Sequence, residues 1–171
     1  SIGIIGAGQM GNGIAHVTAL AGYRVVMMDI SQDSLTAALS LFEKNLERQV
    51  RSAKITAAEK AKALEQIDTT LDISKVGQAD LVIEAATEDE TIKQSIFDLL
   101  LPHLQGYTIL TSNTSSFSIS RLASRTDCAE QFMVFHFKIP VSEMKLVDLC
   151  RVIATDVTTY AACKQVVERL G

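Results

Sequence analysis

The 171-residue sequence lacks the features that would assign it to a membrane, a nucleic acid or an oxidising compartment. No apolar run approaches the roughly 20 residues that a membrane-spanning helix needs. No block of lysine and arginine stands against the net charge of −4, which argues against a nucleic-acid-binding surface. The three cysteines, Cys128, Cys150 and Cys163, lack Cys-x-x-Cys spacing, so we expect buried reduced thiols, no metal site and a cytoplasmic protein.

The sequence also lacks a visible signal peptide, internal repeats, low-complexity segments and linkers. Because it begins directly on a predicted strand, an organellar targeting segment removed upstream stays open as an alternative. What is present fits a globular domain, with a hydrophobic content of 47% and a charged content of 21%. We therefore expect residues 1–171 to form one domain with a sizeable core.

Short apolar runs alternate with helical patterns along the chain. The runs lie at residues 2–5, 24–29, 79–86, 107–111 and 132–135, and a further short strand is predicted at residues 68–71. They are typical of buried parallel strands, and their alternation with helices predicts a Rossmann-type α/β fold. We expect a doubly wound, mostly parallel sheet with a helical-hairpin insertion after the second strand. The helix that follows residue 88 is expected to bury Ile92, Ile96, Leu99 and Leu100.

The chain is organised around residues 6–11, GAGQMG, which stand between the first predicted strand and a helical stretch. In that position a Gly-x-Gly-x-x-Gly pattern predicts a dinucleotide-binding loop. The first glycine allows a tight turn, the second lets the backbone approach a pyrophosphate, and the third lets the helix pack on the strand. The alternative is a glycine-rich turn without function. The predicted cofactor-binding residues here are Gly6, Ala7, Gly8, Gln9, Met10 and Gly11.

Asp29 ends the second apolar run, eighteen positions after Gly11. This is near the spacing of about 20 residues at which such folds place the carboxylate that binds the adenosine ribose. A carboxylate there would repel a 2′-phosphate, and no arginine follows closely, so the sequence favours NAD over NADP. The alternative is that Asp29 only caps the following helix.

Two helices are predicted after Asp29. Apolar residues repeat at helical spacing from Leu35 to Val50, and residues 56–59, TAAE, form a capping box for the second helix. This hairpin is longer than a minimal crossover needs. Either it reaches over a ligand or it packs on the domain as an ordinary insertion. Its tip carries basic side chains that a solvated surface also explains, namely Arg48, Arg51 and Lys54.

Three polar segments follow predicted strands at the sheet edge where ligands bind in this fold class. They are residues 85–88 (AATE), 112–116 (SNTSS) and 136–140 (HFKIP). Clustered hydroxyl and amide groups suit a polar substrate but also satisfy ordinary turns. A lone histidine is more often structural than catalytic, but His136 ends a strand at the predicted active edge, which favours a catalytic role.

These motifs resemble those of the NAD-binding domain of the L-3-hydroxyacyl-CoA dehydrogenases, including 3-hydroxybutyryl-CoA dehydrogenase. The matching segments are residues 6–15 (GAGQMGNGIA), 80–85 (DLVIEA), 112–116 (SNTSS) and 136–147, which contains HF, PV and MKLV. They occur in the family's order and cover nearly the whole chain. The resemblance implies reversible NAD-dependent oxidation of an L-3-hydroxyacyl-CoA to a 3-ketoacyl-CoA. The reaction would serve fatty-acid β-oxidation or short-chain 3-hydroxybutyryl-CoA metabolism.

The resemblance also implies roles for individual residues. His136 would be the general base, Asp148 its carboxylate partner, and Ser115 the group that hydrogen-bonds the substrate oxygen. The residues implied near the nicotinamide half of the cofactor are Glu88, Lys93 and Asn113. The hairpin corresponds to the family's CoA-contacting element, for which the candidates are Arg51, Ser52 and Lys54.

Several departures from the family pattern bear on activity. The carboxylate partner is usually Glu, so Asp148 is shorter by one carbon–carbon bond, about 1.5 Å. Lys138 and Ile139 replace the Phe and Asn of His-Phe-Phe-Asn-Pro. The family's α-helical C-terminal domain, which makes its homodimer interface, is expected to be absent from residues 1–171. The alternatives are a non-catalytic, crystallin-like relative and a sister dehydrogenase acting on a small sugar acid.

Overall fold

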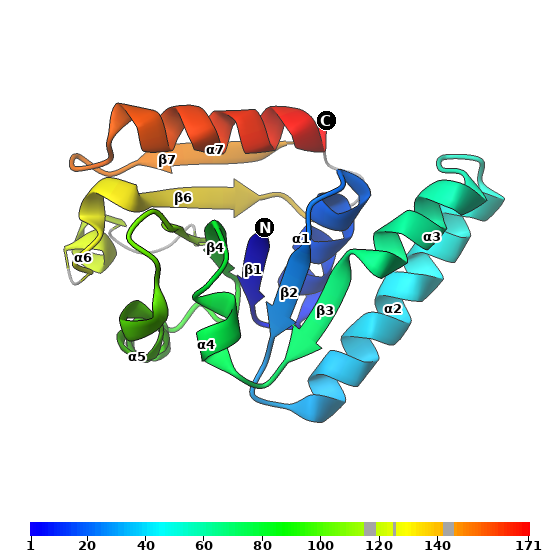
Figure 1. Cartoon of the computed structure of the whole chain (residues 1–171), viewed down its shortest axis with the longest axis horizontal. Coiled ribbons are helices and arrows are strands. Elements are labelled where there is room, and N and C mark those ends of the chain that lie inside the picture. The colour runs from blue at the N-terminus through cyan, green and yellow to red at the C-terminus, as the bar shows by residue number, and fades with distance from the viewer. Residues whose placement is uncertain (115–118, 125, 142–145) are drawn as a thin grey trace.

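The computed structural model describes residues 1–114, 119–124, 126–141 and 146–171. These residues form a seven-stranded sheet with the order β3-β2-β1-β4-β5-β6-β7 (Figure 1). The strands are β1 (Ile2–Ile5), β2 (Val25–Met28), β3 (Ile67–Thr70), β4 (Leu81–Glu84), β5 (Ile109–Ser112), β6 (Phe132–Phe137) and β7 (Val147–Arg151). Neighbouring strands from β3 to β6 are parallel. The predicted Rossmann-type fold is confirmed.

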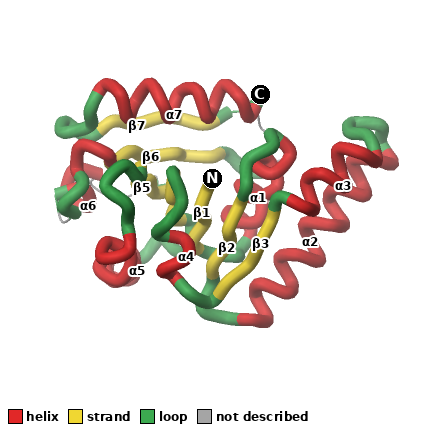
Figure 2. Tube along the Cα trace, in the orientation of Figure 1, coloured by secondary structure: helices red, strands yellow, loops and turns green. Residues whose placement is uncertain are grey.

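Helices cover both faces of the sheet (Figures 1 and 2). The α-helices are α1 (Gln9–Leu20), α2 (Gln32–Arg51), α3 (Ala57–Glu65), α4 (Ile73–Val76), α5 (Glu90–Leu100), α6 (Ile119–Ala123) and α7 (Val157–Leu170). Two short 3-10 helices are η1 (Leu101–His103) and η2 (Ala129–Gln131). One apolar core joins the sheet to α1, α2, α3 and α7, and a second joins its other face to α4, α5 and α6.

The central strands are mostly apolar on both sides because each face of the sheet is covered. In β4, Leu81 and Ile83 belong to the first core, whereas Val82 belongs to the second. Side chains of a strand point alternately to opposite faces, so a doubly covered sheet needs a continuous apolar run. This explains why the sequence predicted these strands correctly from their composition.

β7 is the strand that the sequence analysis did not identify. It pairs antiparallel with β6, and the register places His136 opposite Asp148. Its residues from Val147 to Cys150 are only half-buried and Arg151 is exposed. The strand therefore lacks a continuous apolar run of the kind found in β1, β2 and β4. α7 runs along β6 and β7 (Figure 1), and Asp156 is its N-cap residue.

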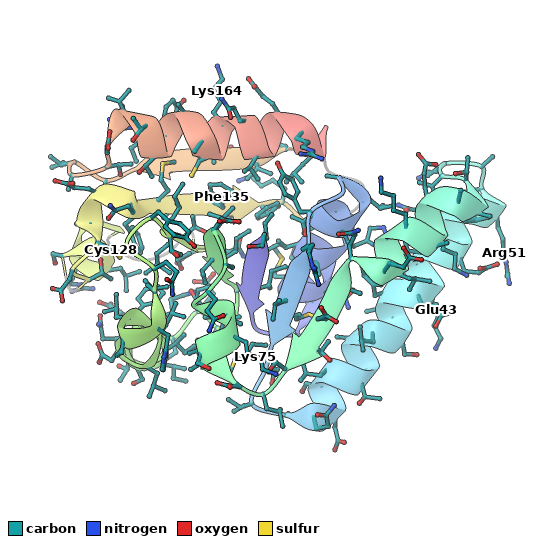
Figure 3. All side chains as sticks on the ribbon, in the orientation of Figure 1. Glu43, Arg51, Lys75, Cys128, Phe135 and Lys164 are labelled. Atoms are coloured by element: carbon teal, nitrogen blue, oxygen red, sulfur yellow. The ribbon has the colours of Figure 1, made fainter. Side chains whose placement is uncertain are left out.

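The predicted helical hairpin is confirmed as α2 and α3. α3 begins with the expected capping box, in which Thr56 and Glu59 satisfy each other's backbone N–H groups. α2 packs on the first core through Leu35, Ala38, Phe42 and Leu46. Leu39, which the periodicity placed in the same stripe, is exposed. Arg51 lies at the tip of the hairpin and points away from the domain (Figure 3).

The predicted inner face of α5 is wrong in part. Ile92 and Leu99 are 51% and 63% exposed, while Lys93, Gln94, Phe97 and Leu100 are buried. Phe97, which the prediction left out, is buried with Leu100 in the second core. Lys93 lies on the same side of α5, where it forms an ion pair with the buried carboxylate of Glu84.

The cysteines differ in burial. Cys163 is buried, whereas Cys128 and Cys150 are half-buried, and all three are free thiols. Desolvation raises the pKa of the Cys163 thiol to about 12. Among the residues that the structure describes, no helix combines the length and apolar character needed to cross a membrane.

Candidate active site

The glycine loop connects β1 to α1 at the carboxyl edge of the sheet. Gly6 has a φ of 105°, a conformation that other residues rarely adopt. A Cβ on Gly11 would lie 1.8 Å from the carbonyl oxygen of Gly6, so the helix packs on the loop only because position 11 has no side chain. A Cβ on Gly8 would meet nothing within 4 Å. Packing therefore explains Gly6 and Gly11 but not Gly8, whose backbone is open to a ligand.

The start of α1 suits an anion. Its N-cap residue is Gly8, no side chain caps it, and no acidic residue stands in its first turn. The N–H groups at a helix N-terminus and the positive end of the helix dipole favour a phosphate. The exposed backbone of Gly8 and this uncapped helix end together fit the pyrophosphate of a dinucleotide.

Asp29 follows β2 beside the glycine loop. Its Oδ2 accepts a hydrogen bond from the Ala7 N–H at 2.9 Å, and its Oδ1 accepts one from the Ser31 N–H at 3.0 Å. The N-cap of α2 is Ser31, whose hydroxyl accepts from the Ser34 N–H. Asp29 is thus not the helix cap, and that alternative is wrong. A carboxylate has about four acceptor positions, so Asp29 keeps capacity for ribose hydroxyls.

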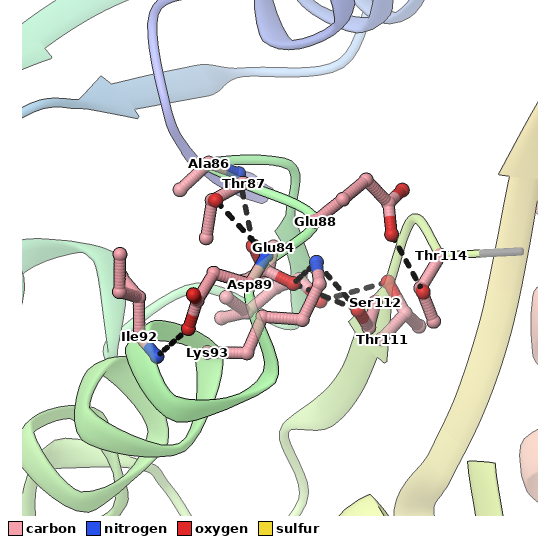
Figure 4. Close-up of polar contacts among 11 residues, drawn as sticks. Glu84, Ala86, Thr87, Glu88, Asp89, Ile92, Lys93, Thr111, Ser112 and Thr114 are labelled. Carbon is pink, nitrogen blue, oxygen red and sulfur yellow. Dashed lines mark hydrogen bonds and ion pairs between the residues drawn. The ribbon is translucent and has the colours of Figure 1, made fainter. Parts of the chain in front are cut away.

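A buried ion pair lies under the edge between β4, β5 and α5 (Figure 4). Nζ of Lys93 is 2.5 Å from Oε2 of Glu84, and both side chains are fully buried. The same Oε2 accepts from the Ser112 hydroxyl at 2.7 Å, and Oε1 accepts from the Ala86 N–H at 2.9 Å. The cluster fixes the segment after β4 to the end of β5. Sequence analysis placed Lys93 near the cofactor but missed its partner, although a Glu that ends an apolar run was a usable signal.

Two further predicted residues join neighbouring strands at this edge. Glu88 is exposed, and its Oε2 accepts from the Thr114 hydroxyl at 3.1 Å. Asn113 is buried, and its Oδ1 accepts from the backbone N–H of Phe137 at 3.0 Å. Asn113 therefore holds the end of β6, which carries His136, against the end of β5.

His136, Lys138 and Asp148 form a polar group across β6 and β7. Nζ of Lys138 lies 2.6 Å from Oδ2 of Asp148 and 2.9 Å from Nδ1 of His136. Nδ1 of His136 is 3.5 Å from Oδ2 of Asp148, beyond an ordinary hydrogen bond. The hydrogen bond from Lys138 lowers the pKa of the Asp148 carboxyl, and the proximity of His136 adds to that effect. The sequence analysis identified Lys138 only as a departure and did not predict its position.

A cavity of about 160 Å³ separates the glycine loop from the residues that follow β6. It is lined by Gln9 and Met10 of α1, by residues of α2, and by Ile139 and Pro140. Ile139 is 56% exposed there, where the resembling family has an amide. The predicted dinucleotide loop and the segment after His136 thus face a common space.

The predicted CoA-contacting residues belong to the helical hairpin and not to this edge of the sheet. Arg51 pairs with Glu47 at 3.5 Å, and the Ser52 hydroxyl donates to the carbonyl of Gln49. Lys54 borders a larger cavity of about 540 Å³ between α1, the hairpin and α7. Ser115, Ser116 and residues 142–145 lie outside the described residues.

The fold and this edge define a Rossmann-type dinucleotide-binding domain. Residues 1–171 match the family model described as 3-hydroxyacyl-CoA dehydrogenase, NAD binding domain. The chain belongs to that family.

Similar proteins agree with this assignment. A 3-hydroxybutyryl-CoA dehydrogenase of Bradyrhizobium diazoefficiens is 48% identical over 170 residues, which are 99% of this chain and 58% of that protein. A 3-hydroxyadipyl-CoA dehydrogenase of Escherichia coli is 36% identical, with coverage of 99% and 34%. The crystal structure of the (S)-3-hydroxybutyryl-CoA dehydrogenase from Ralstonia eutropha superposes with a TM-score of 0.96 at 40% identity, covering 99% of this chain and 60% of that one. This chain thus spans less than two thirds of these relatives.

Proposed function

We propose that the protein containing this chain catalyses the reversible, NAD-dependent oxidation of an L-3-hydroxyacyl-CoA to a 3-ketoacyl-CoA. The observation that carries the proposal is one sheet edge that holds both an open glycine loop and a histidine paired across strands with an acidic residue. The names of the similar dehydrogenases support the acyl-CoA substrate.

NAD would be held by the backbone of the glycine loop and by Asp29. Gly8 and the uncapped start of α1 fit the pyrophosphate, and Gln9 and Met10 begin the helix that receives it. Glu88 and Asn113 would line the nicotinamide side. Lys93 would act there through Glu84, because its ammonium is buried in the ion pair. When bound, NAD supplies the hydride acceptor of the reaction.

His136 would exchange the proton of the substrate hydroxyl. As a base it takes this proton when the hydroxyacyl group is oxidised, and as an acid it returns the proton to the ketone. Asp148 would act on His136 as its carboxylate partner from the neighbouring strand. Ser115 would hydrogen-bond the substrate oxygen, a role that rests on the family resemblance alone.

The finer statements about partners rest on the resemblance. CoA would contact the hairpin near Arg51, Ser52 and Lys54, which carry two positive charges at its tip. A homodimer formed through the family's C-terminal domain is proposed for the longer protein, because the relatives extend beyond the region matched here. The cysteine pattern supports a cytoplasmic location.

The test is NADH oxidation by the full-length protein with acetoacetyl-CoA, followed by absorbance. We expect turnover in the wild type and a loss of about 10²–10⁴-fold in His136→Gln, the usual contribution of a general acid or base. His103→Gln is the matched control because His103 is an exposed histidine on η1. Equal rates in the two variants would contradict the role of His136.

A second candidate is a non-catalytic dinucleotide-binding protein. The observation that favours it is the contact between Lys138 and Asp148, which engages the carboxylate that His136 would otherwise use. Bound NADH without any turnover of acetoacetyl-CoA would support this candidate. Turnover of a small sugar acid but not of the thioester would instead support a sister dehydrogenase.

A further inference from the structure

Lys138 occupies the position between His136 and Asp148. The register of β6 and β7 sets these two residues opposite each other, and Lys138 follows His136 by two positions, directly after the end of β6. Its Nζ is closer to Nδ1 of His136 (2.9 Å) and to Oδ2 of Asp148 (2.6 Å) than those two atoms are to each other (3.5 Å). The histidine and the carboxylate are therefore connected through the lysine.

The chemistry of the three groups determines the direction of these hydrogen bonds. An ammonium group has three donors and no acceptor, and an ionised carboxylate only accepts. The contact of 2.6 Å between Nζ and Oδ2 has the length of a charge-assisted hydrogen bond from ammonium to carboxylate. A lysine held in that form must donate to Nδ1 of His136 as well, so Nδ1 carries no proton.

We propose that Lys138 is a positioning residue that fixes neutral His136 in the tautomer with its proton on Nε2. Asp148 holds Lys138 instead of accepting directly from His136. A histidine paired directly with a carboxylate has the opposite arrangement, with the proton on Nδ1 and a free lone pair on Nε2. The ammonium of Lys138 thus reverses the tautomer that a His–Asp pair alone would select.

The catalytic consequence rests on the proposed function and deepens it. Neutral His136 in this tautomer is poised to donate a proton, which is the step needed for ketone reduction. As the Nε2–H bond breaks and the O–H bond of the product forms, an Nζ–H bond of Lys138 breaks and an Nδ1–H bond forms. The ring stays neutral and Lys138 becomes a neutral amine. Oxidation of the hydroxyacyl group reverses each transfer.

The experiment is ¹⁵N NMR of the histidine side chains in the 171-residue chain, without cofactor or substrate. Protonated and unprotonated ring nitrogens have clearly separate shifts, and the chain has only three histidines. The signals of His136 are assigned by their loss in His136→Gln. At about pH 8.5, about two units above the ordinary imidazole pKa, we expect Nε2–H as the major tautomer in the wild type. Lys138→Met should make Nδ1–H the major tautomer, because the ring then faces Asp148 alone.

Three further variants define the result. Lys138→Arg keeps a cationic donor and should keep Nε2–H. Lys138→Met/Asp148→Ala removes both partners and should lose the Nδ1–H preference. Lys44→Met, on the exposed side of α2, should change nothing. A wild type with Nδ1–H, or a Lys138→Met variant that folds and keeps the wild-type tautomer, would overturn the proposal. Because the sample holds no substrate, an inactive enzyme would count against the proposed function but not against this inference.

Discussion

Two lysine–carboxylate pairs at the same edge of the sheet have almost equal lengths and different surroundings. Nζ of Lys93 lies 2.5 Å from Glu84 with both side chains at 0% exposure. Nζ of Lys138 lies 2.6 Å from Asp148 with exposures of 31% and 46%. The first pair connects β4, β5 and α5 beneath the predicted cofactor position, and the second spans β6 and β7 beside His136.

The comparison shows that burial, rather than distance, determines what such a pair does. Inside the protein, loss of one partner leaves a charge that neither water nor another group compensates. At the surface, water replaces the partner at little cost, so the pair adds little stability. The buried pair therefore connects α5 to the sheet, whereas Lys138 of the exposed pair also contacts Nδ1 of His136.

Replacement of the two lysines should have very different effects on the stability of the domain. Lys93→Met should lower the free energy of unfolding by about 3–5 kcal/mol because Glu84 is left buried and unpaired. Lys138→Met should change it by less than about 1 kcal/mol. Urea unfolding followed by circular dichroism measures both.

The double variant Lys93→Met/Glu84→Gln is the control for this comparison. It removes both charges and should recover part of the loss seen in Lys93→Met. Equal destabilisation by Lys93→Met and Lys138→Met would contradict the argument from burial.

Two glycines of the loop should also differ, because Gly11 is required for packing and Gly8 is expected to contact the ligand. Gly11→Ala should destabilise the domain by roughly 1–3 kcal/mol, the usual cost of overpacking, because its Cβ would meet the carbonyl of Gly6. Gly8→Ala should cost less than about 1 kcal/mol as an N-cap change but weaken NAD binding at least about tenfold, or 1.4 kcal/mol. Thermal unfolding and calorimetric titration separate the two effects. Unchanged NAD affinity in Gly8→Ala would show that the cofactor does not approach this residue.

The smallest expected effect concerns acid titration of the exposed pair. Lys138 lowers the pKa of the Asp148 carboxyl in the folded protein. A lowered folded pKa stabilises the fold above the unfolded value of about 3.9 and loses that contribution as the pH falls through the folded pKa. In Lys138→Met the carboxyl should titrate at higher pH, as measured by ¹³C NMR of the Asp148 side chain. An unchanged titration would show that Lys138 does not interact with Asp148 in solution.

The sequence predicted most of the fold because the strands of a parallel sheet covered on both faces appear in the sequence as apolar runs. It missed β7, whose half-buried residues from Val147 to Cys150 carry no such run. It also predicted the buried face of α5 only in part. Apolar periodicity does not show that Lys93 is buried in an ion pair with Glu84, which lies on β4. Both errors occur where a tertiary contact overrides the local pattern.

In the candidate site, too, the local features were predictable from the sequence and the tertiary contacts were not. The geometry of Gly6 and Gly11 follows from a local strand–turn–helix motif, so sequence reasoning anticipated it. The contact of Lys138 with His136 and Asp148 depends on the register between β6 and β7. No spacing rule along the chain gives that register, and the position of Lys138 had to come from the structure.

We expect this domain to hold NAD through the glycine loop and Asp29. Isothermal titration calorimetry of the 171-residue chain with NAD and with NADP measures this binding. We predict measurable binding of NAD and at least about tenfold weaker binding of NADP, because Asp29 repels a 2′-phosphate at about 1.4 kcal/mol or more. Absence of NAD binding by a folded sample, or preference for NADP, would contradict the account.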